Sequence, residues 1–255
     1  MNRDKLKILL ASNGTIVVLL ILVAVLTFLS PRFLQPSNLE TIVLSMAEIG
    51  IIAIPLTFLI MTGSVDLSVG SIASAAAVTG GLVSSATGDL LLGTLAAIGI
   101  GVLAGVVNGL LVELAGLNPL VVTLGTLNVW GGLALFLAEG KSITGLPEAS
   151  KTISSFQLFG FLSTPMLVLI AVFALGWWVL NRKAFGRSVL ATGGNARAAF
   201  LMGINVRWVR IRLFVLTGVA SAIAGTLMSW KLQAASPNLG SGLEFSALTV
   251  VLLGG

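Results

Sequence analysis

The residues that could carry chemistry in this chain are few, and most of them lie within apolar sequence. The chain contains no His and no Cys, which excludes imidazole bases, thiol nucleophiles, disulfides and the usual zinc sites. Polar side chains inside apolar stretches are more informative, because they cost free energy in hydrocarbon and usually face protein or a water-filled path. Four of them are candidates for lining the path of a polar solute: Glu48, Asp66, Asn108 and Asn128. We expect no catalytic residue, no bound metal and no cofactor.

Each of these polar residues also has a purely structural interpretation. Glu48 either faces a solute path or is a protonated or paired structural carboxyl, and the sequence does not separate the two. Asp66 lies in a polar break at 62–71, where it is well placed to cap a helix that starts near residue 67. The same break could instead be irregular backbone that lines the path. Asn108 and Asn128 could likewise either line the path or have a structural role.

A short motif lies inside the basic segment 181–212. Gly193-Gly194-Asn195 predicts a turn, followed by a helix of about two turns over 196–202. Asn195 can cap this helix, and Gly203 can close it in the left-handed conformation. The helix would present Phe200 and Leu201, and it is too short to be stable alone in water. We therefore expect it to rest either on the bilayer surface or on a cytoplasmic partner.

The elements that position these residues follow from the composition. Of 255 residues, 56% are hydrophobic and 9% are charged, against about 25% charged in soluble domains. This excludes a water-soluble monomer and predicts an all-α polytopic membrane bundle. A bilayer core of about 30 Å needs about 20 helical residues. Seven apolar stretches of that size run over approximately 10–30, 39–61, 67–86, 90–111, 119–138, 164–180 and 211–230.

The sequence after Leu243 is apolar but too short for a further complete span. We expect it to be part of an eighth span, so that the C-terminal part of the domain is missing, with a re-entrant or surface-lying end as the alternative. We treat 1–255 as one transmembrane domain, with 181–210 as its long cytoplasmic loop.

The placement of Lys and Arg predicts which loops share a side of the membrane. Ten basic residues lie in one set of alternating segments, which comprises 1–9, 62–66, 112–118 and 181–212. Four lie in the other set, which comprises 31–38, 87–89, 139–163 and 231–241. Cytoplasmic loops are enriched in Lys and Arg, so the sequence predicts a cytoplasmic N-terminus. The net charge of +5 is therefore a topology signal and does not indicate nucleic-acid binding.

Small residues recur at four-residue spacing in two of the predicted spans. They are Gly93, Ala97, Gly101, Gly105 and Gly109 in one span, and Gly218, Ala222 and Gly225 in the other. This spacing favours close helix packing. A movable seam beside a central pathway is the alternative.

Four stretches together resemble the permease subunits of bacterial ABC importers for sugars, the ribose-type group that includes autoinducer-2 and rhamnose permeases. They are TGSVDLSVGS at 62–71, NPLVVTLGT at 118–126, FGRSVLATGGNARAAFLMGINV at 185–206 and GSGLEFSALTVVLLGG at 240–255. The family usually has SGIDLS where this chain has Gly63-Ser64-Val65-Asp66, and its members continue past the VLLGG stretch.

The resemblance implies a subunit that moves a sugar across the inner membrane by alternating access. It implies a second permease subunit, identical or not, two cytoplasmic ATP-binding subunits, and a periplasmic sugar-binding protein that meets segment 139–163. The basic loop is similar to the family's coupling helix, which docks on the ATPase. On that basis the coupling residues would be Gly194, Asn195, Arg197, Ala199, Phe200, Leu201 and Gly203.

Two other functions remain open at this point. A non-ABC secondary transporter would rest the basic loop on lipid, and an inactive truncated subunit would only assemble with partners. The tripeptide Gly140-Lys141-Ser142 does not make the chain a nucleotide-binding protein, because a P-loop needs glycine at position 135, where this chain has Leu. Any ATP-derived energy must come from another subunit.

Overall fold

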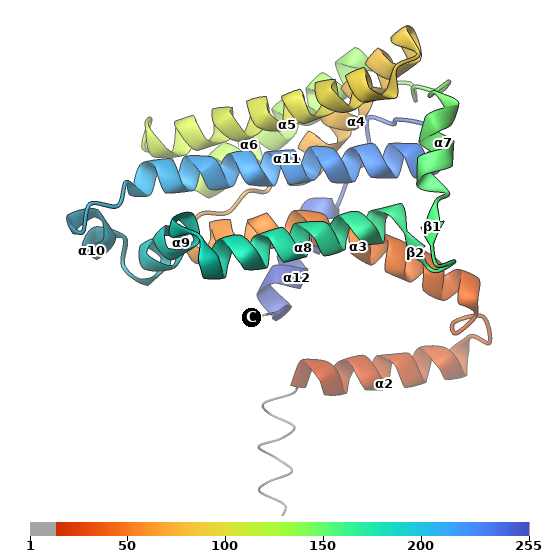
Figure 1. Ribbon diagram of the computed structural model, residues 1–255, viewed down its shortest axis with the longest axis horizontal. Coiled ribbons are helices and arrows are strands. Elements are labelled where there is room, and N and C mark those ends of the chain that lie inside the picture. Colours follow the sequence, from red (N-terminus) through yellow and green to blue (C-terminus); the bar gives the residue numbers. More distant parts are fainter. Residues whose placement is uncertain (1–13, 255) are drawn as a thin grey trace, which may run out of the picture. The chain divides into compact units, whose positions relative to one another are not determined.

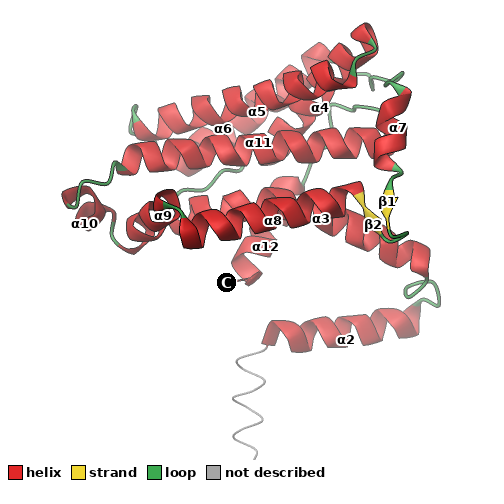
Figure 2. Cartoon of the chain, viewed as in Figure 1, coloured by secondary structure: helices red, strands yellow, loops and turns green. Residues whose placement is uncertain are grey.

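The structure, a computed structural model, describes residues 14–254 and is almost entirely helical (Figures 1 and 2). Its helices are α2 (Gly14–Leu29), α3 (Pro36–Met61), α4 (Val69–Thr87), α5 (Leu90–Glu113), α6 (Pro119–Leu137), α7 (Glu148–Ser154), α8 (Thr164–Arg182), α9 (Ala184–Gly194), α10 (Ala196–Leu201), α11 (Val206–Leu232) and α12 (Leu243–Gly254). Strands β1 (Gln157–Leu158) and β2 (Leu162–Ser163) form a small antiparallel hairpin.

The chain divides into two compact units, Met1–Ser45 and Met46–Gly255. The described part of the first unit contains α2 and the start of α3. The second unit contains the rest of α3 and all later elements, and every site discussed below lies within it.

Six of the seven predicted membrane-spanning stretches are confirmed. Six helices in residues 14–254 are long and apolar enough to cross a bilayer: α3, α4, α5, α6, α8 and α11. Helix α2 covers 16 residues of the first predicted span, whose residues 10–13 lie outside the described part. Helix α11 begins at Val206, five residues earlier than predicted, because Asn205 caps it by accepting a hydrogen bond from the Trp208 N–H at 3.3 Å. The chain is an all-α polytopic membrane bundle.

Close packing of α5 against α4 and α11 forms the centre of the second unit. A Cβ atom added to Gly101 would overlap the carbonyl oxygen of Gly218, and one added to Gly218 would overlap the Gly101 carbonyl oxygen. Gly105 meets the backbone of Phe214 in the same way. The predicted ladder of small residues therefore lets two helix backbones approach to contact distance, as expected for helices that associate in lipid.

Two groups of connections mark the two ends of this bundle (Figure 1). At one end, which we call the α10 end, Arg210 of α11 bonds to Thr62 after α3 and to Glu113 at the end of α5. At the other, the α7 end, a β-bridge joins Ile143 to Ala235. Segments 62–66, 112–118 and 181–212 thus share one end, as the placement of basic residues predicts; segment 1–9 of the same set lies outside the described residues.

Two non-helical segments run alongside the membrane-spanning helices. Segment 62–68 joins α3 to α4, and segment 236–242 leads from the α7 end to α12. Irregular backbone at membrane depth must be buried in protein or line a water-filled cavity, because lipid cannot satisfy its polar groups. These two segments position the candidate site.

Candidate functional site

Asp66 is the centre of a buried hydrogen-bond cluster. One carboxylate oxygen, Oδ1, accepts from the Ser68 N–H at 2.9 Å and from the Ser68 hydroxyl at 2.6 Å. The other, Oδ2, accepts from Asn108 Nδ2 and from the Thr217 hydroxyl, each at 3.4 Å. Asp66, Ser68, Asn108 and Thr217 are all fully buried. The cluster fastens segment 62–68 to α5 and α11.

This cluster lies well inside the bundle. Asn108 is five residues before the end of α5, and Thr217 is eleven residues after the start of α11. At 1.5 Å per residue these positions are about 8 Å and about 16 Å from the helix ends. Segment 62–68 therefore satisfies its polar groups within the protein.

The predicted capping role of Asp66 is wrong by two residues. Helix α4 begins at Val69 with Ser68 as its N-cap, and the Ser68 side chain makes no capping bond. Asp66 instead accepts the Ser68 N–H, an Asx-type bond that holds residues 66–68 in a turn. This local bond competes with helix formation and delays the start of α4.

We expect Asp66→Ala to destabilise the protein, because it leaves the buried N–H and hydroxyl of Ser68 without their acceptor. Asn108 and Thr217 lose only their longer bonds, since they still donate to the Ser68 hydroxyl and the Phe214 carbonyl, each at 2.8 Å. Each unpaired group costs about 1–3 kcal/mol, so the total loss is expected to be about 2 kcal/mol or more. The matched control is Asp89→Ala, which removes the exposed N-cap of α5 and is expected to cost about 1 kcal/mol. Thermal unfolding of both variants in detergent measures the difference. Equal shifts in melting temperature would contradict a central role for the Asp66 cluster.

The two irregular segments lead to a backbone contact between two glycines. A Cβ atom on Gly240 would overlap the carbonyl oxygen of Gly70, and one on Gly70 would overlap the Gly240 carbonyl oxygen and the Glu244 carboxylate. The Gly240 N–H donates to the Ser74 hydroxyl at 2.8 Å. Only glycine at both positions allows this approach. The start of α4 and segment 236–242 are therefore held together beside the start of α12.

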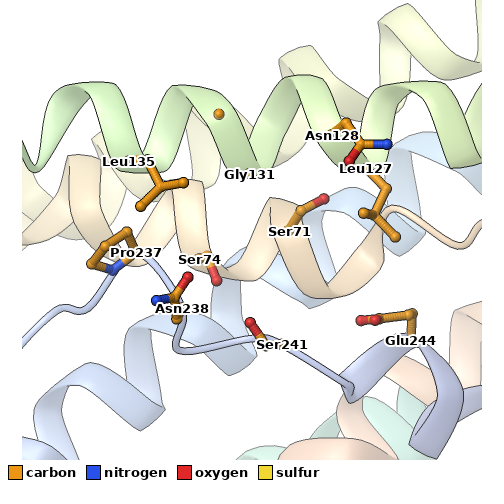
Figure 3. A pocket seen from close by; sticks show the side chains of 11 residues that line it. Ser71, Ser74, Leu127, Asn128, Gly131, Leu135, Pro237, Asn238, Ser241 and Glu244 are labelled. Carbon is orange, nitrogen blue, oxygen red and sulfur yellow. The ribbon is translucent and has the colours of Figure 1, made fainter. Parts of the chain in front are cut away.

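A cavity of about 320 Å³ with several polar side chains in its wall opens at this meeting point (Figure 3). Its walls come from α4, α6, segment 236–242 and the first turn of α12. The lining residues are Ser71, Ser74, Leu127, Asn128, Gly131, Gly132, Leu135, Pro237, Asn238, Ser241 and Glu244. Among them, Glu244 is the one charged residue. The volume lies at the lower end of the range for small-molecule pockets.

Hydroxyl and amide groups give this cavity donors and acceptors for an uncharged polar solute. Figure 3 shows the Ser71 side chain directed toward Asn128 and the Glu244 carboxylate directed toward Ser241. Glu244 Oε1 accepts from the Gly242 N–H at 3.3 Å, which orients the carboxylate at the start of α12. A carboxylate accepts a hydrogen bond from a solute hydroxyl more strongly than the neutral serine and asparagine side chains do, because charge-assisted hydrogen bonds are stronger than neutral ones.

The four polar residues selected from the sequence lie in three different places. Asn128 lines the cavity, whereas Asp66 and Asn108 meet in the buried cluster. Glu48 lies elsewhere, with its Oε1 atom 3.3 Å from Lys231 Nζ in an ion pair between α3 and α11. The cavity residues that sequence reasoning missed are Ser71, Ser74, Asn238, Ser241 and Glu244. A signal for three of them existed, since Ser71, Ser241 and Glu244 fall in stretches 62–71 and 240–255, and Ser74 lies three residues after the first.

The short helix α10 forms as its capping residues predict. Asn195 Oδ1 accepts from the Ala198 N–H at 3.0 Å. At the other end Gly203 has a φ of 86°, and the Ile204 N–H donates to the Ala199 carbonyl at 3.0 Å. These bonds form a Schellman motif. The helix ends at Leu201, one residue before the predicted end.

The predicted turn at Gly193-Gly194-Asn195 begins later than expected. Gly193 and Gly194 are the last residues of α9, and the chain turns only at Asn195. A Cβ atom on Gly193 would overlap the Met61 carbonyl oxygen, so this glycine lets α9 approach the end of α3. The proposed docking side chains of α10 are free: Phe200 is 67% exposed and Leu201 is 78% exposed. Ala199 is buried beneath them.

Residues 38–255 match the protein family described as the permease component of branched-chain amino acid transport systems. The chain belongs to this permease family. The permease is 38% identical over 248 residues to the ribose import permease protein RbsC of Bacillus subtilis (strain 168), covering 95% of this chain and 76% of RbsC. No solved structure matches it.

Two further relatives of the permease are also transport proteins. It is 33% identical over 247 residues to the L-arabinose ABC transporter permease protein AraH of Azospirillum brasilense, covering 97% of this chain and 73% of AraH. It is 38% identical over 216 residues to the autoinducer 2 import system permease protein LsrC of Yersinia pseudotuberculosis serotype O:3 (strain YPIII), covering 84% of this chain and 61% of LsrC.

Membership of this family makes the permease a multi-pass transport subunit of the inner membrane and not an enzyme. The family works within transport systems that have ATP-binding and substrate-binding components. A non-ABC secondary transporter does not fit this membership.

Proposed function

We propose that this permease imports a sugar or sugar-like solute in an ATP-driven system. The observation that carries the proposal is the cavity between α4, α6 and segment 236–242, because its walls suit an uncharged polyhydroxy solute. The three relatives named for ribose, L-arabinose and autoinducer 2 support it.

The cavity argues against an amino acid as the solute, although the family description names branched-chain amino acids. An amino acid carries both an ammonium, which could pair with Glu244, and a carboxylate, which needs a partner of its own. A carboxylate that is buried without a partner costs free energy. The residues that line the cavity include no cation to pair with that carboxylate.

In the proposed mechanism, a periplasmic binding protein delivers the solute at the α7 end, and segment 139–163 forms part of that contact. Asn128 contacts the solute in the cavity, while the Asp66–Asn108 cluster and Glu48 hold the surrounding elements in place. A second permease subunit, identical or different, completes the path. Alternating access then opens the cavity to each side in turn.

The α10 end is proposed to face the cytoplasm, together with the N-terminus. Segment 181–210 is then the coupling loop, and its basic residues obey the positive-inside rule. The residues proposed to dock on the ATP-binding subunit or to shape the docking helix are Gly194, Asn195, Arg197, Ala199, Phe200, Leu201 and Gly203. Exposed apolar side chains on a short capped helix suit insertion into a groove of a partner.

Uptake by the reconstituted system tests the proposed solute class. The permease is placed in vesicles with its ATP-binding subunit and its binding protein, and radiolabelled D-ribose, L-arabinose and L-leucine are offered in turn. The expected result is ATP-dependent uptake of at least one sugar and no uptake of leucine. Uptake of leucine alone would refute the sugar assignment.

We expect Asn128→Leu to lower sugar uptake at least tenfold without lowering the amount of protein in the membrane. The substitution removes an amide from the cavity wall and narrows the space with an apolar side chain. The control is Val129→Leu, which changes the adjacent exposed residue outside the cavity and is expected to retain uptake within twofold. Comparable losses in the two variants would argue against this cavity as the solute site.

A further inference from the structure

The guanidinium of Arg210 joins three membrane-spanning elements at the α10 end. Its Nε and Nη2 atoms donate to the Thr62 carbonyl oxygen at 3.1 Å and 2.8 Å. Its Nη1 atom lies 3.3 Å from Glu113 Oε1. Carbonyl groups at the end of a helix lack hydrogen-bond partners within the helix. Two N–H groups of Arg210 donate to such a carbonyl, that of Thr62, just beyond the end of α3. One side chain of α11 thus holds the exits of both α3 and α5.

The helices on both sides of α10 contact this same point. Gly193, next to the last residue of α9, packs against the Met61 carbonyl with no room for a side chain. Arg210, five residues into α11, bonds to Thr62. A groove of about 770 Å³ has Phe200 of α10 in its wall together with Glu113 and Arg210. Displacement of α10 would therefore act on residues 61–62 from two sides.

The chain beyond Thr62 leads directly to the cavity. Asp66 follows four residues later and is fixed to α5 and α11. Gly70 follows eight residues after Thr62 and contacts Gly240, and the next residue, Ser71, lines the cavity. Segment 62–68 is non-helical, so its ends can shift without breaking a helix. It is a direct covalent connection between the α10 end and the cavity wall.

We propose that Arg210 is the positioning residue that transmits movement of α10 to segment 62–68, and thereby to the cavity. The inference rests on the proposed function, because it assumes that an ATP-binding subunit moves α10. The active contact is the bond from Arg210 to the Thr62 carbonyl, and the ion pair with Glu113 orients the guanidinium. The connection is a contiguous chain of packed and hydrogen-bonded groups, which suits coupling over this distance.

The test compares Arg210→Gln with Arg207→Gln in the assembled system. Arg207 is an exposed residue on the same helix, one turn earlier, and it lines the same groove, so the two variants differ in the bonds to Thr62 and Glu113 that Arg210 makes. The measurement is ATP hydrolysis in nanodiscs, without binding protein and with binding protein loaded with the sugar that the uptake assay identifies. For Arg210→Gln we expect the ATP-binding subunit to co-purify normally, the KM for ATP to be unchanged, and the stimulated maximal rate to fall at least tenfold. Arg207→Gln is expected to stay within twofold of the unsubstituted protein.

Two further variants separate the Thr62 contact from the ion pair and from misfolding. Glu113→Gln removes the ion pair but leaves the bonds to Thr62, and we expect its stimulated rate to fall no more than threefold. Gly193→Ala pushes α9 away from Met61 without touching Arg210, and we expect a loss similar to that of Arg210→Gln. Its control is Gly99→Ala, where the added Cβ meets no atom within 4 Å. If Arg210→Gln fails to fold, Arg210→Lys provides the test, because it keeps the positive charge and loses the fork of donors to the Thr62 carbonyl.

The outcomes distinguish this inference from the proposed function. If the unsubstituted system transports no sugar, the proposed function is wrong and the inference falls with it. If the unsubstituted system transports sugar but Arg210→Gln and Gly193→Ala keep their stimulated rates within twofold, only the inference is overturned. A tenfold loss of the stimulated rate of ATP hydrolysis in Glu113→Gln would show that the ion pair, and not the bond to the Thr62 carbonyl, is the active contact. That result would also overturn the inference.

Discussion

Replacing Gly101 with valine is expected to abolish the accumulation of folded permease. The added side chain would overlap the backbone of Gly218, which belongs to α11 and cannot rotate away as a flexible side chain can. Overpacking a core commonly costs about 1–3 kcal/mol, and a clash between two helix backbones is expected to exceed that range. Such a loss is a large fraction of the 5–15 kcal/mol by which proteins are typically stable. The measurement is the amount of monodisperse protein recovered in detergent, by size-exclusion chromatography of a fluorescent fusion.

Gly99→Val is the matched control for this prediction. Gly99 lies on the same helix, two residues earlier, and a Cβ atom there meets nothing within 4 Å. We expect its yield to stay within twofold of the unsubstituted chain, because valine costs little helix propensity relative to glycine and this side faces outward. If both variants accumulate equally, the α5–α11 contact is not what holds the bundle together.

Leu201→Asp is expected to leave the permease inserted and folded but to uncouple it from ATP. Leu201 is 78% exposed on α10 and makes little contribution to packing within the chain. A carboxylate in an apolar partner groove would be buried without a counter-charge, which is costly. We expect at least a tenfold loss of both co-purified ATP-binding subunit and sugar uptake. Unchanged co-purification and uptake would refute docking through α10.

The same chemical change elsewhere at the α10 end controls for charge alone. Leu117 is an exposed residue in the connection between α5 and α6. Leu117→Asp is expected to retain co-purification and uptake within twofold. A loss equal to that of Leu201→Asp would show that any added negative charge at this end disturbs assembly.

The local parts of this fold could be predicted from the sequence. The membrane-spanning stretches follow from apolar length alone, and each described one is found within a few residues of its predicted place. Helix α10 could also be predicted from the sequence, because Asn195 and Gly203 act on backbone groups only three or four residues away. The glycine ladder of α5 indicated a close helix contact, although it did not name α11 as the partner.

Prediction failed where two local bonds compete or where distant segments meet. Asp66 could cap a helix or hold a turn with Ser68, and contacts with Asn108 and Thr217 favour the turn. The interpretation of Glu48 depended on whether a cation lay nearby, and Lys231, 183 residues later, decides it. No spacing rule connects residues so far apart.

The sequence by itself determined that this protein is a membrane bundle with a basic end and a short capped helix, because hydrophobic length, charge and capping act over a few residues. Only the tertiary structure decided where a solute could bind. Ser71 and Ser241 line the same cavity as Asn128 because Gly70 and Gly240 let the start of α4 and segment 236–242 touch. A serine that lines a cavity and a serine that packs a helix look the same in sequence, since the difference lies in what the rest of the chain places opposite them.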